Sequence, residues 1–355
     1  MHTRSGVRTG PARVTTPVPR DLWWEVAAGD PDCRVTQTPT WLDCLCAEGH
    51  HRDAGRLYEF DDGTRVVLPL TGTHRPGPLD ALESWPGGWG IGGPVVQGDA
   101  GPGTARAVYA DLLREPAFRV GLRLRPGDGD IWAAAAPAAF RTRAHTTQVV
   151  DLTGGIDAVR RGYHSQVRRD VRRAERMDVE VEVDRTGRLA PVFHGLYEKS
   201  IERWAGRQHE PLALARLRRR RDFPESRLAT VAQRLGESCA IWVAWYQGMP
   251  CASIVVLRHA RHAKYWRGAM DRELAHPCRA NALLHHLAIE DACAAGCDRY
   301  DMGDSAPGSS LAHYKANFGA ASLSSPLCLR ERLPLSAAEH ALRETVKRVI
   351  RFQDA

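Results

Sequence analysis

Residues 281–319 constrain the fold of this chain more than any other segment. Apolar side chains recur at three- and four-residue steps over 281–296 and end in a glycine, which predicts an amphipathic helix. Residues 300–303 then predict a short buried strand, followed by a loop rich in glycine, serine and proline. A turn of helix carrying Tyr314 and Lys315 closes the segment. This order of elements places a cation beside an aromatic ring at the mouth of a strand.

Length and composition favour a two-domain globular protein. The chain has 355 residues, and single domains usually contain about 100 to 200. Its apolar runs are shorter than the roughly 20 residues that cross a bilayer, and the basic first twenty residues lack the apolar stretch of a secretion signal. Nine cysteines, an odd number, do not suit a disulfide scaffold, and Cys33, Cys44 and Cys46 match no standard zinc spacing. We therefore expect a cytoplasmic protein with reduced cysteines and no metal, and the sequence leaves the oligomeric state open, a monomer included.

The sequence pattern divides the chain into four parts, with the main change near residue 150. Residues 1–20 are polar and predict a disordered leader. Residues 21–150 form one module that includes a predicted hairpin, and residues 151–330 form a second module that opens with a helix over 156–174. Residues 331–355 predict a C-terminal helix that begins with a capping box.

Arginines gather in two places, and the net charge of +7 indicates a polyanionic partner. In the first cluster, residues four apart share a helix face, so Arg168 with Arg172 and Arg169 with Arg173 form paired cationic ridges. We assign phosphate contacts to Arg168, Arg169 and Arg172. The alternative is a solvated face of an amphipathic helix.

The second cluster has five arginines within residues 216–221 and no acidic neighbour before Asp222. It lacks interleaved aromatic residues, so it suits contacts to a nucleic-acid backbone better than base stacking. We assign Arg218 and Arg219 to phosphate binding. A disordered basic loop is the alternative.

The segment from Gly88 to Gly93 matches the G-x-G-x-x-G pattern of dinucleotide-binding proteins. That fingerprint must join a strand to a helix. Here Pro86 precedes the glycines, Pro94 closes them, and no helix follows. We interpret the segment as a turn whose glycines allow close backbone approach.

The segment 281–319 resembles the C-terminal signature of the FemABX family, and the arginine-rich helix near 163–176 resembles the start of that family's second module. The resemblance spans roughly residues 39–325 as a series of short motifs. It implies an α/β fold with mixed sheets, in which two GNAT-like acyltransferase modules pack around a cleft and the C-terminal helix returns to the first module. It also implies transfer of an aminoacyl group from tRNA to an amine.

The resemblance assigns catalysis to Lys315, with Tyr314 beside it. Attack of an amine on an ester develops negative charge on the carbonyl oxygen, and an ammonium group stabilises that charge. Asp301 and Asp304 lie in the same segment and are candidate proton acceptors. Six further residues are assigned to the acceptor cleft: Trp89, Trp204, Arg267, Asn281, Ser305 and Phe318.

The donor and the acceptor stay open at the level of sequence. Aminoacyl-tRNA is the expected co-substrate, with no other cofactor, and the acceptor is a small-molecule amine such as a cell-wall precursor or a specialised metabolite. An acyl-CoA-dependent N-acyltransferase is the first alternative, although the R-x-x-G-x-G/A pattern that wraps a pyrophosphate is absent from the sequence. A non-catalytic nucleic-acid-binding module is the second alternative.

Overall fold

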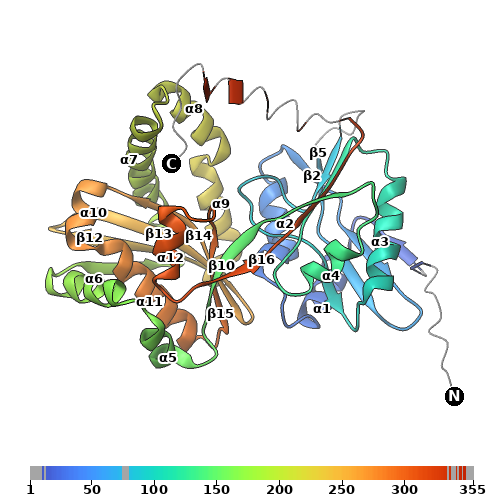
Figure 1. Ribbon diagram of the computed structural model, residues 1–355, viewed down its shortest axis with the longest axis horizontal. Helices are drawn as coiled ribbons and strands as arrows, with labels where there is room; N and C mark the ends of the chain where they lie inside the picture. The colour runs from blue at the N-terminus through green and yellow to red at the C-terminus, as the bar shows by residue number, and fades with distance from the viewer. Residues whose placement is uncertain are drawn as a thin grey trace. The chain divides into compact units, whose positions relative to one another are not determined.

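The computed structural model describes residues 10–11, 13–73, 80–333, 336, 341, 344–345 and 347–348 (Figure 1). The chain forms two compact units. The first contains the described residues up to Thr146 together with residues 323–333, and the second contains residues 147–322 together with the described residues from 336 onward. Both units combine helices with sheets that hold parallel and antiparallel strand pairs, which confirms the predicted α/β class.

The first unit contains two sheets. One has four strands in the order β1 (Arg13–Thr15), β3 (Arg56–Glu59), β4 (Arg65–Leu68) and β7 (Val95–Gln97). The other has six strands in the order β2 (His51–Asp53), β5 (Thr71–Thr73), β6 (Ala81–Glu83), β8 (Arg119–Arg123), β17 (Leu327–Glu331) and β9 (Arg141–Arg143). The helices of the unit are α1 (Arg20–Ala28), η1 (Val35–Gln37), α2 (Pro39–Cys46), α3 (Pro102–Arg114) and α4 (Gly129–Ala134).

The ends of the chain differ from the expected division. Residues 13–15, inside the expected disordered leader, form β1 and pair antiparallel with β3. Strand β17 pairs with β8 and β9, so residues 323–330 belong to the first unit and not to the second module. Most of the predicted helix over 331–355 lies outside the described residues, and its packing on the first module stays a prediction.

The second unit is built on one seven-stranded sheet. Its order is β11 (Glu180–Asp184), β12 (Cys239–Tyr246), β13 (Met249–His259), β14 (His262–Met270), β15 (Arg299–Asp304), β10 (Thr146–Asp151) and β16 (Ala321–Ser324). The strand pairs from β11 to β14 are antiparallel, as is β10 with β15, whereas β14 and β15 run parallel. The helices are α5 (Gly155–Gly162), α6 (Ser165–Arg176), α7 (Ala190–Gln208), α8 (Leu212–Asp222), α9 (Glu225–Leu235), η2 (Gly236–Ser238), α10 (Arg272–Cys278), α11 (Ala280–Ala294) and α12 (Ser310–Ala316).

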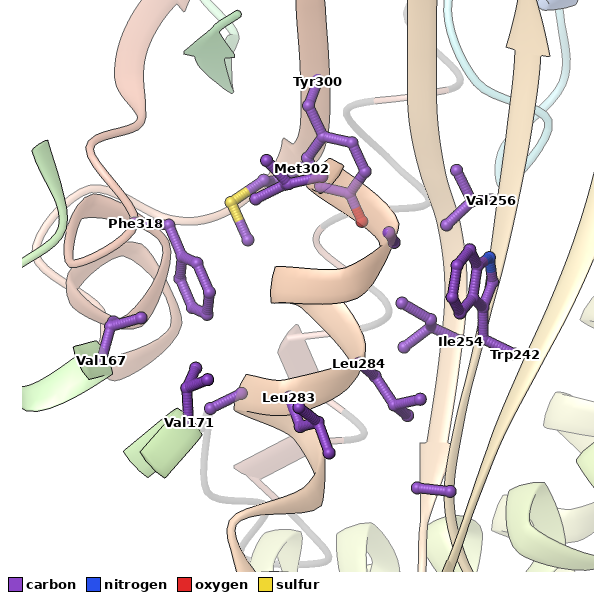
Figure 2. Close-up of a cluster of buried hydrophobic side chains, with 14 of the residues drawn as sticks. Val167, Val171, Trp242, Ile254, Val256, Leu283, Leu284, Tyr300, Met302 and Phe318 are labelled. Atoms are coloured by element: carbon purple, nitrogen blue, oxygen red, sulfur yellow. The ribbon is translucent and has the colours of Figure 1, made fainter. Parts of the chain in front are cut away.

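Helices cover both faces of this sheet. Trp242 of β12 belongs to the same buried cluster as Leu283 and Leu284 of α11, which fills one face (Figure 2). Because side chains alternate across a strand, Ile241 and Val243 point to the opposite face, where α7 and α9 contact β12. The strands are therefore buried on both sides, which explains their nearly continuous apolar sequence.

The predicted single helix over 156–174 is two helices, α5 and α6. Tyr163 between them has an extended backbone, and His164 caps α6 by accepting a hydrogen bond from the Gln166 amide at Nδ1 (3.2 Å). The predicted apolar face is nevertheless buried along both helices: Val159, Tyr163, Val167, Val171 and Ala174. The periodicity therefore predicted the buried face, whereas the histidine cap that interrupts the helix was missed.

The glycine-rich segment adopts the turn that its prolines indicate. It leads into strand β7 and not into a helix. A Cβ atom added at Gly92 would lie 1.8 Å from the Ser84 carbonyl oxygen, so only glycine fits there. The close backbone approach is within the protein itself. Across the described residues, the helices fall short of the length and apolar content needed to cross a bilayer.

Candidate active site

Lys315 lies in the last turn of α12, which begins where Ser309 Oγ accepts a hydrogen bond from the Ala312 amide (3.1 Å). The lysine is 3% exposed. Its Nζ donates to the backbone carbonyls of Gly303 (2.9 Å) and Asp304 (2.7 Å). An ammonium group has three donors, so these two bonds leave one N–H for another acceptor.

The carbonyls that hold Lys315 come from a distorted end of β15. The register of β10 with β15 shifts between Gln148 and Val149, which leaves Met302 as an extra residue in β15. Gly303 follows with φ of +77°, a conformation that favours glycine. A bulge of this kind re-aims the backbone that follows it, and bulges are frequent beside active sites.

Strands β14 and β15 part at the same place. Their parallel pairing covers three positions and ends with Lys264 opposite Asp301. Strand β14 then has a bulge of its own, with Trp266 as the extra residue between Tyr265 and Arg267. The two neighbouring strands therefore leave the regular ladder together, beside the carbonyls that bind the catalytic candidate Lys315.

Asp301 anchors this end of the sheet. Its carboxylate accepts hydrogen bonds from Thr147 Oγ1 (2.6 Å), Lys264 Nζ (3.1 Å) and the Gly303 amide (2.7 Å). The residue is 3% exposed, so these contacts favour a positioning role over the expected role in proton transfer. The Asp304 side chain is exposed, and its backbone carbonyl makes the contact to Lys315. Lys264 and Thr147 were not predicted, because their positions opposite Asp301 depend on strand pairing.

Burial lowers the pKa of the Lys315 ammonium to about 8. The carboxylates of Asp301 and Asp304 act in the opposite direction, and the charge of Lys264 acts with burial. Lys315 is therefore mainly charged at pH 7 and loses its proton over the next two pH units.

Aromatic rings surround the apolar side of α12. The His285 ring lies 6.0 Å from Tyr314 and 5.6 Å from Phe318, and Tyr265 lies 4.8 Å from the same histidine. Burial lowers the pKa of His285 to about 3, and the nearby charge of Lys315 adds to that effect. His285 is therefore neutral, and its Nδ1 lies 3.1 Å from the Tyr300 hydroxyl.

Tyr314 has a buried hydroxyl that makes no hydrogen bond to the described residues. Burial raises the pKa of this phenol, with Tyr265 and Asp170 acting in the same direction, so the hydroxyl keeps its proton. Its ring packs edge-on against Phe318 (5.3 Å). The ring therefore packs at the end of α12 beside Lys315, and the catalytic assignment of Tyr314 stays a prediction.

The predicted acceptor residues separate into groups. Phe318 is fully buried beside Tyr314, and Ser305 donates to Gln148 Oε1 (2.5 Å), so both lie near the Lys315 site. Asn281 donates to Met270 Sδ (3.2 Å) at the start of α11. Trp204 of α7 packs against the guanidinium group of Arg219 (4.9 Å), and Arg267 of β14 lies over the Phe223 ring (5.1 Å).

Trp89 does not line an open surface. Its ring is 2% exposed and packs edge-on against Trp41 (5.3 Å), whose Nε1 donates to the Trp89 carbonyl (3.1 Å). A tryptophan that is packed on all sides belongs to the core of the first unit. The family resemblance gave the expectation that Trp89 lines a cleft, but its side chain serves internal packing.

The start of α6 is joined directly to α12. The His164 amide donates to the carbonyl of Asn317 (2.8 Å), two residues after Lys315. Arg168, in the first turn of α6, donates to the Tyr163 carbonyl. The predicted ridge of Arg168, Arg169 and Arg172 is exposed on this helix. The helix that carries the first arginine cluster is thus hydrogen-bonded at its start to the residue that follows α12.

The second arginine cluster forms helix α8 and not a disordered loop. The expectation that it lacks acidic partners was wrong, because carboxylates distant in the sequence supply them. Arg218 makes two hydrogen bonds to Glu210 (2.6 and 3.1 Å), and Arg219 lies over the ring of Trp204 (4.9 Å). Among the described residues, no group of three or more histidine, cysteine or acidic side chains is arranged to hold a metal ion.

Comparisons with known proteins agree on the fold. Residues 161–316 match a family model described as an acetyltransferase (GNAT) domain. The chain is similar to the crystal structure of FemX (TM-score 0.65, 12% identity, 89% of this chain and 96% of that one). It is also similar to L-PGS from Bacillus licheniformis (TM-score 0.51, 14% identity, 86% and 95%). A further match is the C-terminal domain of a protein described as a lysylphosphatidylglycerol synthetase from Agrobacterium fabrum (TM-score 0.52, 13% identity, 93% and 97%).

No curated protein sequence matches the chain. The similarity to FemX confirms the predicted fold, because it covers nearly the whole of both chains. The GNAT match places an acyltransferase domain in the second unit, from just before α6 to the end of α12. Lys315 lies at the end of the matched residues, beside the parted strands.

Proposed function

We propose that the protein transfers an aminoacyl group from aminoacyl-tRNA to the primary amine of a small-molecule or cell-wall-precursor acceptor. The observation that carries this proposal is the hydrogen bond from the His164 amide to the Asn317 carbonyl (2.8 Å), which joins α6 to α12. Aminoacyl-tRNA carries its reactive ester at the end of a polyanion. A site for this donor needs guanidinium groups that bind the phosphates and a cation that stabilises charge at the ester. The exposed arginines of α6 and the buried Lys315 supply these two kinds of group in adjacent helices.

The reaction uses the third donor of Lys315. The acceptor amine attacks the ester carbonyl carbon, and the carbonyl oxygen becomes an oxyanion that the free N–H of Lys315 binds. The C–N bond then forms fully and the ester C–O bond to the ribose breaks. The nitrogen loses one proton and the departing ribose oxygen gains one, so the step needs no cofactor. An aminoacyl ester is activated enough to require little help from a base.

An acyl-CoA thioester is the second candidate donor. The GNAT match over residues 161–316 favours it, because that family model is described as an acetyltransferase domain. Lys315 would stabilise the thioester oxyanion in the same way. The acceptor amine and the amide product are common to both proposals, so the donor distinguishes them.

A donor assay tests both candidates. The purified chain is incubated with charged tRNA or with acetyl-CoA and a panel of primary amines, and amide products are measured with and without RNase. We expect product from charged tRNA that disappears after RNase treatment. Product that survives RNase and requires the thioester would contradict the tRNA proposal and support the second candidate.

Removal of the ammonium group tests the role of Lys315. We expect Lys315→Ala to lower kcat on the order of 100-fold or more, the usual scale for one preorganised donor, with a smaller effect on donor affinity. Lys315→Arg should keep partial activity, because its planar fork cannot reproduce the contacts of a compact ammonium. Tyr314→Phe should cost less, since the hydroxyl makes no hydrogen bond to the residues that the structure describes and the ring contacts remain. Turnover of Lys315→Ala at the wild-type rate would remove this residue from the mechanism.

A further inference from the structure

His285 of α11 is a buried histidine that contacts the residues on either side of Lys315. It is 4% exposed, and its ring lies 6.0 Å from the Tyr314 ring and 5.6 Å from the Phe318 ring. These two residues precede and follow Lys315 in the sequence, and their own rings pack edge-on (5.3 Å). The histidine therefore packs against the end of α12, where the lysine lies.

The same histidine is held by two strands of the sheet. Tyr300 of β15 extends toward α11, and its hydroxyl lies 3.1 Å from His285 Nδ1 (Figure 2). Tyr265 of β14 packs edge-on against the histidine ring (4.8 Å). His285 therefore links strands β14 and β15 to the residues that flank Lys315.

Hydrogen-bond chemistry fixes the tautomer of His285. Tyr300 is fully buried, and burial raises the pKa of its phenol, so the hydroxyl keeps its hydrogen. Within the described part of the chain, the hydrogen-bond partner of this hydroxyl is His285 Nδ1. A hydroxyl that donates to Nδ1 leaves the hydrogen of the neutral imidazole on Nε2. The other tautomer would leave the buried phenolic hydrogen without an acceptor, which is unfavourable.

The neighbouring His286 takes the opposite tautomer by the same reasoning. Burial lowers its pKa, so it is neutral, and its Nε2 lies 3.1 Å from Nη2 of Arg160. A guanidinium group can only donate, so Nε2 accepts and the hydrogen lies on Nδ1, 3.3 Å from the Tyr163 hydroxyl. His286 is 5% exposed and contacts α5 and the residue that follows it. It therefore provides a matched control for His285.

A neutral ring at position 285 suits the charged lysine beside it. The Lys315 ammonium is close enough to help lower the pKa of His285, after the larger effect of burial. A charged imidazole would repel the ammonium, whereas a neutral ring excludes water from it without adding charge. The charges that act on Lys315 are those of Asp301 and Asp304 on β15 and Lys264 on β14. His285 therefore acts on the lysine through packing and burial.

We propose that His285 is a positioning residue for the acyl transfer, held by Tyr300 as the Nε2-protonated ring, and that it fixes the end of α12 and keeps water from the Lys315 ammonium. The proposal rests on the proposed function, in which Lys315 binds the oxyanion, and adds a residue that acts through that lysine. Oxyanion stabilisation depends on a donor that is already in place, so a displacement of about 1 Å at Lys315 should lower kcat.

Nitrogen chemical shifts test the tautomer in the wild-type chain. Histidine labelled with ¹⁵N is incorporated, and correlations between ring nitrogens and ring carbon-bound hydrogens distinguish a protonated from an unprotonated nitrogen. The variants His285→Asn and His286→Asn assign the two sets of signals. We expect the hydrogen on Nε2 at His285 and on Nδ1 at His286 in the same spectrum. A hydrogen on Nδ1 at His285 would overturn the proposal.

The titration of Lys315 tests the positioning role. The chain contains four lysines: Lys199, Lys264, Lys315 and Lys347. A sample labelled with ¹³C at lysine Cε therefore gives few signals, and Lys315→Arg identifies the relevant one. His285→Asn keeps an oxygen that can accept from Tyr300 but removes the ring that packs against α12. Because burial is the main cause that lowers the Lys315 pKa to about 8, we expect this pKa to rise by about one unit in the variant.

The matched control is His286→Asn, which makes the same change at the next residue of α11. It should lower the free energy of unfolding by a comparable amount in urea denaturation but leave the Lys315 titration unchanged. In turnover, kcat should fall about 10-fold or more in His285→Asn with little change in the KM for the donor. In His286→Asn, kcat should stay near the wild-type value.

An unchanged Lys315 pKa or a wild-type kcat in His285→Asn would contradict the positioning role, as would an equal pKa shift in His286→Asn. Tyr300→Phe removes one hydroxyl and keeps the packing, so it carries the test if His285→Asn does not fold. In Tyr300→Phe the ring should lose its tautomer preference and the Lys315 pKa should rise, and an unchanged result in either measurement would overturn the proposal. The NMR measurements need no turnover. A chain that gives the expected spectra but makes no amide therefore contradicts the proposed function alone.

Discussion

Helices α6 and α8 carry similar runs of arginine but hold them in different environments. In α8, Arg216 pairs with Glu202 (2.5 Å), Arg218 with Glu210 and Arg220 with Glu198 (2.9 Å). In α6, the hydrogen bonds of the ridge go to neutral groups of the same segment. Arg169 binds Ser165 and Gln166, and Arg168 and Arg172 bind backbone carbonyls.

This difference decides which arginines are available to a polyanion. An arginine that holds a carboxylate must give up that ion pair before it binds a phosphate, and Glu210 is mostly buried with a 5% exposed side chain. An arginine bound to neutral groups gives up less. Arginine density in a sequence therefore overestimates the charge that a surface offers, and α6 is the better candidate for tRNA.

The largest expected effect comes from removing the α6 ridge. Arg168, Arg169 and Arg172 changed together to Ala should weaken tRNA affinity on the order of 100-fold at low salt, at about 1 kcal/mol or more for each charged contact. The slope of log affinity against log salt should fall by about 2 to 3, because each neutralised phosphate releases condensed counterions. Filter binding between 50 and 200 mM salt measures both quantities. An unchanged slope would contradict phosphate binding by these arginines and support the alternative that they form a solvated helix face.

The corresponding substitution in α8 should lower the stability of the protein without changing its affinity for tRNA. Arg218→Ala removes the partner of the buried Glu210 carboxylate, so we expect a loss of about 1 to 3 kcal/mol in the free energy of unfolding. Urea denaturation measures this loss. Arg221→Ala, at an exposed arginine of the same helix, serves as the matched control. A large fall in tRNA affinity with unchanged stability in Arg218→Ala would reverse the assignment of the two helices.

A smaller effect is expected from pH, which should change kcat but not the affinity for tRNA. Lys315 acts as a charged donor and its pKa is about 8, so the active fraction should fall roughly 10-fold between pH 7 and pH 9. The tRNA affinity, which we assign to α6, should stay level over the same range. The measurement is kcat at saturating substrates. In Lys315→Arg the decrease in kcat between pH 7 and pH 9 should disappear. A kcat that rises through pH 8 in the wild-type chain, but not in this variant, would contradict the role as a charged donor and would indicate a neutral lysine acting as a base.

Local patterns in the sequence predicted several elements around the candidate site in the second unit. The apolar periodicity of residues 281–294 placed helix α11 correctly. The Gln247-Gly248 pair, a dipeptide typical of hairpin turns, joins β12 to β13, and both residues have positive φ as such a turn requires. The Tyr314-Lys315 pair was placed correctly at the end of a short helix after a buried strand. These features depend on neighbours within a few residues, so they can be predicted from the sequence alone.

Only the tertiary structure decided what surrounds these elements. The bulge at Met302, the pairing of Lys264 with Asp301 and the ion pair of Arg218 with Glu210 join parts of the chain that local periodicity does not relate. The burial of the Trp89 side chain likewise depends on its packing against Trp41. Helical and strand periods report which face of an element is buried, but strand register and side-chain partners depend on the free energy of the whole packed unit. The sequence therefore indicated Lys315 as the catalytic candidate, whereas the fold set the pKa of its ammonium group and its carbonyl partners.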